Sequence, residues 1–165
     1  MKILSFFLVL IIGLSGCAGD SGDTGTADSD LDHVLETDHF RINYSDSDES
    51  CVGDMAAVLE KNYNRITSDM DYTVSIKTIV NVYPDIDLFH AAVGMPSAED
   101  WLVGTTDYPG IISIVSPLNP GSVHDYNSIM NYASVHEFVH VVQYRKYSQD
   151  LYKWPMWLVE GVPVY

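Results

Sequence analysis

The sequence HEFVH, His136 to His140, contains the residue types and the spacing best suited to chemistry in this chain. Residues four apart lie on one face of an α-helix, so His136 and His140 can both point at a single metal ion. Zinc binds neutral imidazole nitrogen and carboxylate oxygen, and a catalytic zinc site keeps one position for water beside three protein ligands. Glu137 directly follows the first histidine, so its carboxylate can take a proton from that water, whose pKa zinc lowers to about 7.

For this motif alone, an alternative interpretation is a buried helix whose two histidines only form hydrogen bonds. The surrounding sequence favours the metal site. The helix is apolar and follows a segment that alternates predicted strands and helices. The other histidines, His33, His39, His90 and His124, have no metal-like spacing, and we expect them to be surface or core residues.

A second motif, WLVEGVPVY, places Glu160 after His140 with nineteen residues between them. Together the two motifs resemble the gluzincin zinc metallopeptidases of the thermolysin-like superfamily, in which HExxH is followed by Trp-x-x-Glu-Gly at the start of a second helix. The resemblance implies that His136, His140 and Glu160 bind Zn²⁺ and that Glu137 is the catalytic residue. It would act as general base while zinc-activated water attacks a peptide carbonyl.

Upstream of the motifs, the hydrophobic pattern predicts alternating strands and helices. Residues 40–44 alternate apolar and polar side chains as in a half-buried strand, and residues 55–66 repeat apolar side chains at helical spacing. Residues 74–83 are rich in β-branched residues and predict a second strand. Asp85 is a suitable cap for a short helix that ends before Gly94.

The segment directly before the HExxH motif predicts a turn, a strand and a long helix. Residues 104–109 have turn composition, residues 111–115 form a compact apolar strand, and the helix should run from Asp125 or Asn127 to about Tyr144. In gluzincins the strand before the motif helix is an edge strand that borders the cleft. The resemblance therefore implies that residues 110–115 can pair with an extended polypeptide substrate; an ordinary core strand is the alternative.

These elements predict an α+β fold with a zincin-like N-terminal lobe, in which a mixed twisted sheet with an edge strand packs against the active-site helix. We expect the domain at residues 33–165 to be incomplete, because gluzincins continue into a C-terminal helical lobe. Pro163 would lie inside the glutamate helix, where a proline costs about 3 kcal/mol. The alternative function is an inactive or truncated gluzincin-like lipoprotein that serves as a zinc- or peptide-binding module.

The N-terminus has the features of an exported protein. Residues 1–16 combine Lys2 with an apolar run too short to span a membrane, which predicts a signal peptide. They end at Leu14-Ser15-Gly16-Cys17, which resembles the bacterial lipobox and implies lipidation of Cys17. Residues 17–32 would form an acidic tether. We therefore expect a lipid-anchored protease of the bacterial cell envelope, held in the outer membrane or at the cell surface.

Charge excludes one class of partner. With 23 acidic and 8 basic residues among 165, the formal net charge is −15 at pH 7. Such a surface repels phosphate backbones, so we expect no nucleic-acid partner.

Overall fold

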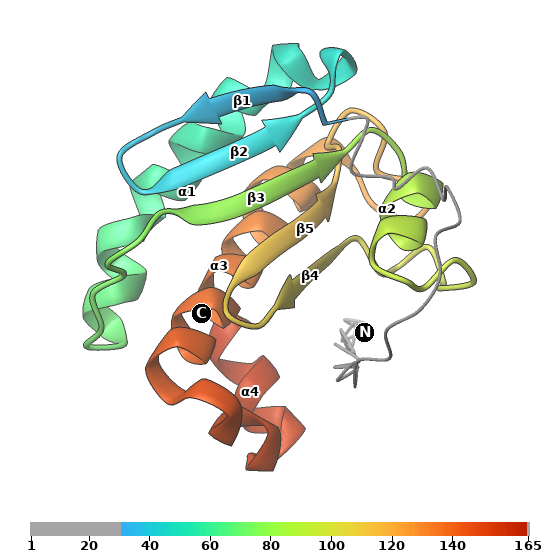
Figure 1. Ribbon diagram of the computed structural model, residues 1–165. Helices are drawn as coiled ribbons and strands as arrows, with labels where there is room; N and C mark the ends of the chain where they lie inside the picture. The colour runs from blue at the N-terminus through green and yellow to red at the C-terminus, as the bar shows by residue number, and fades with distance from the viewer. Residues whose placement is uncertain (1–30, 165) are drawn as a thin grey trace, which may run out of the picture.

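A five-stranded mixed sheet in the order β1-β2-β3-β5-β4 is the centre of the computed structural model, which describes residues 31–164 (Figure 1). Its strands are β1 (His33–Glu36), β2 (Phe40–Tyr44), β3 (Thr78–Tyr83), β4 (Gly104–Asp107) and β5 (Ile111–Val115). The three central strands are parallel, whereas β1 and β4 are antiparallel to their neighbours. The sheet and its helices confirm the predicted α+β class.

Two long helices cover one face of the sheet, behind it in Figure 1: α1 (Glu49–Asp69) and α3 (Ser134–Tyr147). The short helix α2 (Ile86–Ala92) contacts β3 and β5. After α3, a 3₁₀ segment (Ser148–Lys153) reverses the chain so that α4 (Met156–Gly161) returns toward α3. Within residues 31–164, no helix is long and apolar enough to cross a membrane.

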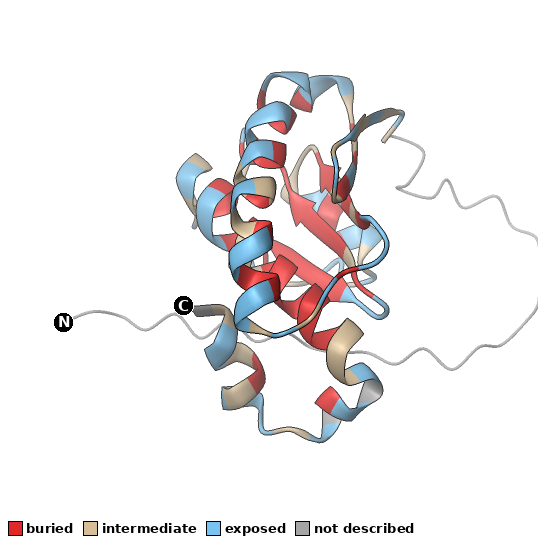
Figure 2. Ribbon diagram, turned by 90° about the vertical axis from the view of Figure 1, so that its left-hand side faces the viewer, coloured by how far each residue is buried: buried red, intermediate tan, exposed pale blue. Residues whose placement is uncertain are grey.

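The core lies between the sheet and the two long helices, where the buried residues of Figure 2 face one another. The alternation predicted for β2 is confirmed, since Phe40, Ile42 and Tyr44 are all buried. Phe138 on α3 is fully buried and packs edge-on against Phe40, with ring centroids 5.0 Å apart. It also stacks on Tyr63 of α1 at 5.7 Å. Phe138, inside the HExxH motif, thus anchors the motif helix to the sheet and to α1.

The predicted turn at residues 104–109 is wrong in part, because Gly104–Asp107 forms strand β4. A hairpin at Tyr108–Gly110 folds β4 back against β5, and this pairing imposes extended backbone on residues with turn composition. The prediction that residues 110–115 form the edge strand is wrong for the same reason. β5 lies between β3 and β4, so β4 is the edge strand next to the motif helix.

The predicted helix before the motif is confirmed at its start, where the Asp125 carboxylate accepts hydrogen bonds from the Ser128 amide and hydroxyl. Its first part is a π-helix (Ser128–Ala133) that runs directly into α3. Such π segments often lie at functional sites.

The Asp85 cap of α2 is confirmed by a 2.8 Å hydrogen bond from the Leu88 amide. Pro163 lies in the 3₁₀ turn (Val162–Val164) that directly continues α4, and not inside α4 itself. The predicted signal peptide, Cys17 and residues 17–30 of the predicted tether lie outside the described residues.

Candidate metal centre

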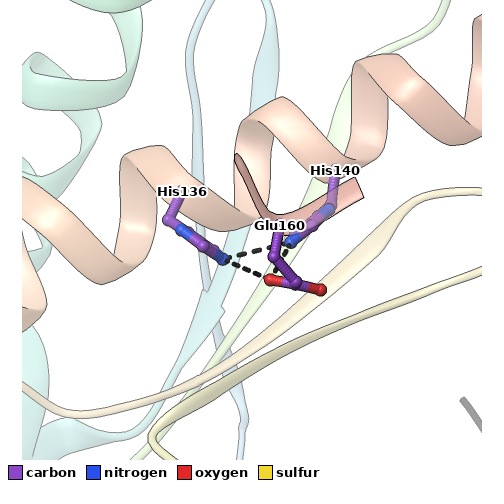
Figure 3. A group of neighbouring side chains, drawn as sticks. All are labelled: His136, His140 and Glu160. Carbon is purple, nitrogen blue, oxygen red and sulfur yellow. Dashed lines mark hydrogen bonds and ion pairs between the residues drawn. The ribbon is translucent and has the colours of Figure 1, made fainter. Parts of the chain in front are cut away.

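Helix α3 places two imidazoles side by side, and α4 brings a carboxylate to them (Figure 3). The Nε2 atoms of His136 and His140 are 3.1 Å apart. Glu160 Oε2 lies 3.4 Å from each of these nitrogens. All three side chains are largely buried, with 14%, 3% and 14% of their area exposed for His136, His140 and Glu160. The three residues predicted as metal ligands therefore converge on one point.

The separations between these atoms match what a tetrahedral metal requires. Ligands about 2.0 to 2.1 Å from a tetrahedral zinc ion lie roughly 3.3 Å from one another, close to the 3.1 and 3.4 Å found here. Both carboxylate oxygens of Glu160 are buried and have no hydrogen-bond partner among the described residues, although Oε2 lies within ion-pair distance of both imidazoles. A cation among the three side chains would give these oxygens a closer partner, so this group can hold a metal ion. Within residues 31–164 no other cluster of histidine, cysteine and acidic side chains meets the same distance limits.

The charges of the site are arranged to attract a cation. Burial alone raises the pKa of Glu160, but the two imidazoles outweigh burial and lower this pKa to about 2. Burial alone lowers the pKa of His140, but Glu160 and Glu137 outweigh burial and raise it. These charges favour the ionised form of Glu160, and any proton on His140 would compete with an incoming metal ion.

Gln143 fixes the orientation of His140, and it was not among the site residues predicted from the sequence. Its amide oxygen lies 2.7 Å from His140 Nδ1, and its amide nitrogen donates to the main-chain oxygen of Val159 at 3.0 Å. The side chain is 1% exposed. A polar residue three positions after a ligand, in an otherwise apolar stretch of helix, was the available signal.

Glu137, the predicted general base, is buried against the edge strand. The Thr106 hydroxyl of β4 lies 2.7 Å from Glu137 Oε2 and 3.0 Å from its main-chain oxygen. Gly104 is close on the same strand, where a Cβ would lie 3.0 Å from Glu137 Cγ. Both residues fall within the turn predicted at residues 104–109, so their contact with Glu137 was not predicted.

A cleft of about 560 Å³ opens beside the metal ligands. His136, Glu137, Gly104, Val103, Tyr132 and Pro163 are among its lining residues. The Val115 amide donates to the Val103 carbonyl, so the alternating pattern of an antiparallel pair turns the peptide groups of Gly104 and Thr106 away from β5. The edge of the sheet at the cleft thus presents outward-facing backbone donors and acceptors.

None of the remaining histidines belongs to the metal-ligand group, as expected from their spacing, although His124 also lines the cleft. His39 is hydrogen-bonded to Glu60, and His90 to the Leu102 carbonyl. His33 pairs with Asp46, and His124 with the Trp101 carbonyl.

Comparison of the chain with protein-family models, curated proteins and solved structures found no match. The chemistry of the centre is therefore inferred from its own geometry.

Proposed function

We propose that this protein is a zinc-dependent peptide-bond hydrolase of gluzincin-like type. The observation that carries the proposal is the convergence of three ligand atoms, 3.1 to 3.4 Å apart. Buried Glu137 lies next to them, on the helix that carries both histidines. Two imidazoles and one carboxylate form a ligand set used by catalytic zinc in metallopeptidases. Glu137 directly follows His136, so its carboxylate could accept a proton from a water molecule bound beside the ligands.

A zincin-like architecture is part of this proposal. Its support is a mixed sheet whose antiparallel edge strand, β4, contacts the helix carrying HExxH. The exposed edge of β4 could bind substrate, because an extended polypeptide can pair with the outward-facing peptide groups of Gly104 and Thr106. Backbone pairing of this kind binds many sequences, and the cleft beside it would select among side chains.

When bound, zinc would supply Lewis acidity and lower the pKa of a water molecule to about 7. His136, His140 and Glu160 would hold the ion. Glu137 accepts the proton of the attacking water and passes it to the leaving amine. The Thr106 hydroxyl holds the Glu137 carboxylate in place during these transfers.

We further propose that the protein is exported and anchored to the bacterial envelope through lipid on Cys17. The support is the N-terminal sequence alone: an apolar leader followed by Leu14-Ser15-Gly16-Cys17. A membrane-held hydrolase would meet polypeptides outside the cytoplasm.

The test compares Glu137→Gln with the unaltered protein, and Glu99→Gln serves as a matched control because Glu99 is an exposed residue of the α2–β4 connection. We expect about one zinc per chain in all three proteins. Hydrolysis of a denatured protein substrate should fall about 10² to 10⁴-fold only in Glu137→Gln. Full activity in Glu137→Gln would refute the assignment. Zinc binding without turnover of any peptide by the unaltered protein would instead indicate a zinc- or peptide-binding module.

A further inference from the structure

Gln143 connects the two segments that carry the metal ligands. It is one of the largest fully buried side chains and lies on α3, three residues after His140. One end of its amide contacts the His140 ring, and the other contacts the main chain of α4.

The direction of each hydrogen bond follows from the chemistry of the partners. The Val159 carbonyl can only accept, so the amide nitrogen of Gln143 must face it. The amide oxygen then faces His140 Nδ1, which must carry a proton. In the neutral imidazole, this proton leaves Nε2 with its lone pair directed toward His136 and Glu160.

The second bond acts on Glu160. The Val159 carbonyl belongs to the same planar peptide unit as the nitrogen and Cα of Glu160, so holding this oxygen holds the backbone from which the ligand projects. Helix α4 is short and partly exposed, and the 3₁₀ turn that follows it contacts α3. It is six residues long, its N-terminus has no side-chain cap, and Trp157 is 72% exposed. Val159 is its one buried residue, packed in a small cluster with Tyr144 and Leu151.

We propose that Gln143 is a positioning residue that makes His140 and Glu160 bind metal as one unit. This inference rests on the proposed zinc site and deepens it. The hydrogen bonds of Gln143 fix the tautomer of one ligand and the backbone of the other before the metal arrives. Zinc affinity therefore depends on Gln143, although its side chain does not contact the ion.

Two substitutions of Gln143 test its hydrogen bonds to His140 and to the Val159 carbonyl. Gln143→Met has similar length and removes both. Gln143→Glu keeps an acceptor for His140 but sets a carboxylate oxygen against the Val159 carbonyl, so it tests the bond to α4. Val142→Ala is the matched control, because Val142 is fully buried on the same helix, its truncation lowers stability, and its side chain has no group that can bind metal or form a hydrogen bond.

The experiment measures the zinc dissociation constant of each protein by competition with a chelator. We expect Gln143→Met to weaken binding about 10 to 100-fold, as for other partners of metal ligands. Gln143→Glu should also bind more weakly than the unaltered protein, and Val142→Ala should bind within about 3-fold of it. In a Glu160→Ala background, Gln143→Met should cost less than it does alone, because one of the two ligands it positions is gone.

Unchanged zinc affinity in both Gln143 variants, or a loss no larger than that of Val142→Ala, would overturn the inference while leaving the zinc site intact. Should Gln143→Met fail to fold, the comparison of Gln143→Glu with Val142→Ala decides the matter. Failure of the unaltered protein to bind zinc would overturn both the inference and the proposed function. Zinc binding that depends on Gln143, in a protein that cleaves nothing, would retain the inference and refute only the hydrolase.

Discussion

The contact between Thr106 and Glu137 predicts an energetic coupling that can be measured without substrate or metal. The Thr106 hydroxyl lies 2.7 Å from a carboxylate oxygen of Glu137, whose side chain is buried. A hydrogen bond to a charged group contributes about 1.5 to 3 kcal/mol, and one to a neutral amide about 0.5 to 1.5 kcal/mol. Thr106→Val should therefore cost about 1 to 1.5 kcal/mol more in the natural protein than in Glu137→Gln.

Urea denaturation of the zinc-free proteins, followed by circular dichroism, gives the four free energies of unfolding that this cycle requires. Thr105→Val is the control, because Thr105 is also buried on β4 but its hydroxyl has no hydrogen-bond partner. Its removal should be neutral or stabilising. Thr106→Ser should restore most of the stability lost in Thr106→Val. A coupling energy below about 0.5 kcal/mol, the usual error of additivity, would refute the reasoning.

Three further outcomes are expected. Zinc at about 1,000 times its dissociation constant should stabilise the protein by about 4 kcal/mol in thermal melts, and His136→Ala should abolish this shift. Burial alone raises the pKa of Glu60, but hydrogen bonds from His39 outweigh burial and lower it. The stability that ionised Glu60 contributes is complete above its pKa in the unfolded chain and is lost as the pH falls through its lower pKa in the folded protein. In urea denaturation at a series of pH values, Glu60→Gln should therefore lose less stability on acidification than the unaltered protein. Gly110→Ala should destabilise the protein by about 2 kcal/mol or more, because Gly110 has φ +116° and a Cβ would lie 2.9 Å from Val141 Cγ1 on α3. Gly53→Ala in α1, where a Cβ meets nothing, should stabilise it by about 0.5 to 1 kcal/mol. Equal effects of the two substitutions in urea denaturation would contradict this.

Several elements were predictable because their signals are local. The alternation in β2, the helical repeat in α1 and the Asp85 cap of α2 all match the structure. β3 was predicted from residue 74 but begins at Thr78. Strand β4 was missed because Gly104 and Asp107 at its ends, and Pro109 and Gly110 after it, favour turns. Pairing with β5 makes this segment extended. The sequence of residues 104–107 alone does not show that a neighbouring strand will pair with it.

The sequence by itself determined that His136 and His140 share one face, because the helical repeat is a property of neighbouring residues. Through its resemblance to gluzincins, the WLVEG motif also predicted Glu160 as a third ligand. Only the tertiary structure decided that Glu160 Oε2 lies 3.4 Å from both imidazoles and that Gln143 joins α3 to α4. The sheet order likewise put β4, not β5, against Glu137. These contacts join segments distant in the chain, and their geometry depends on how the elements pack.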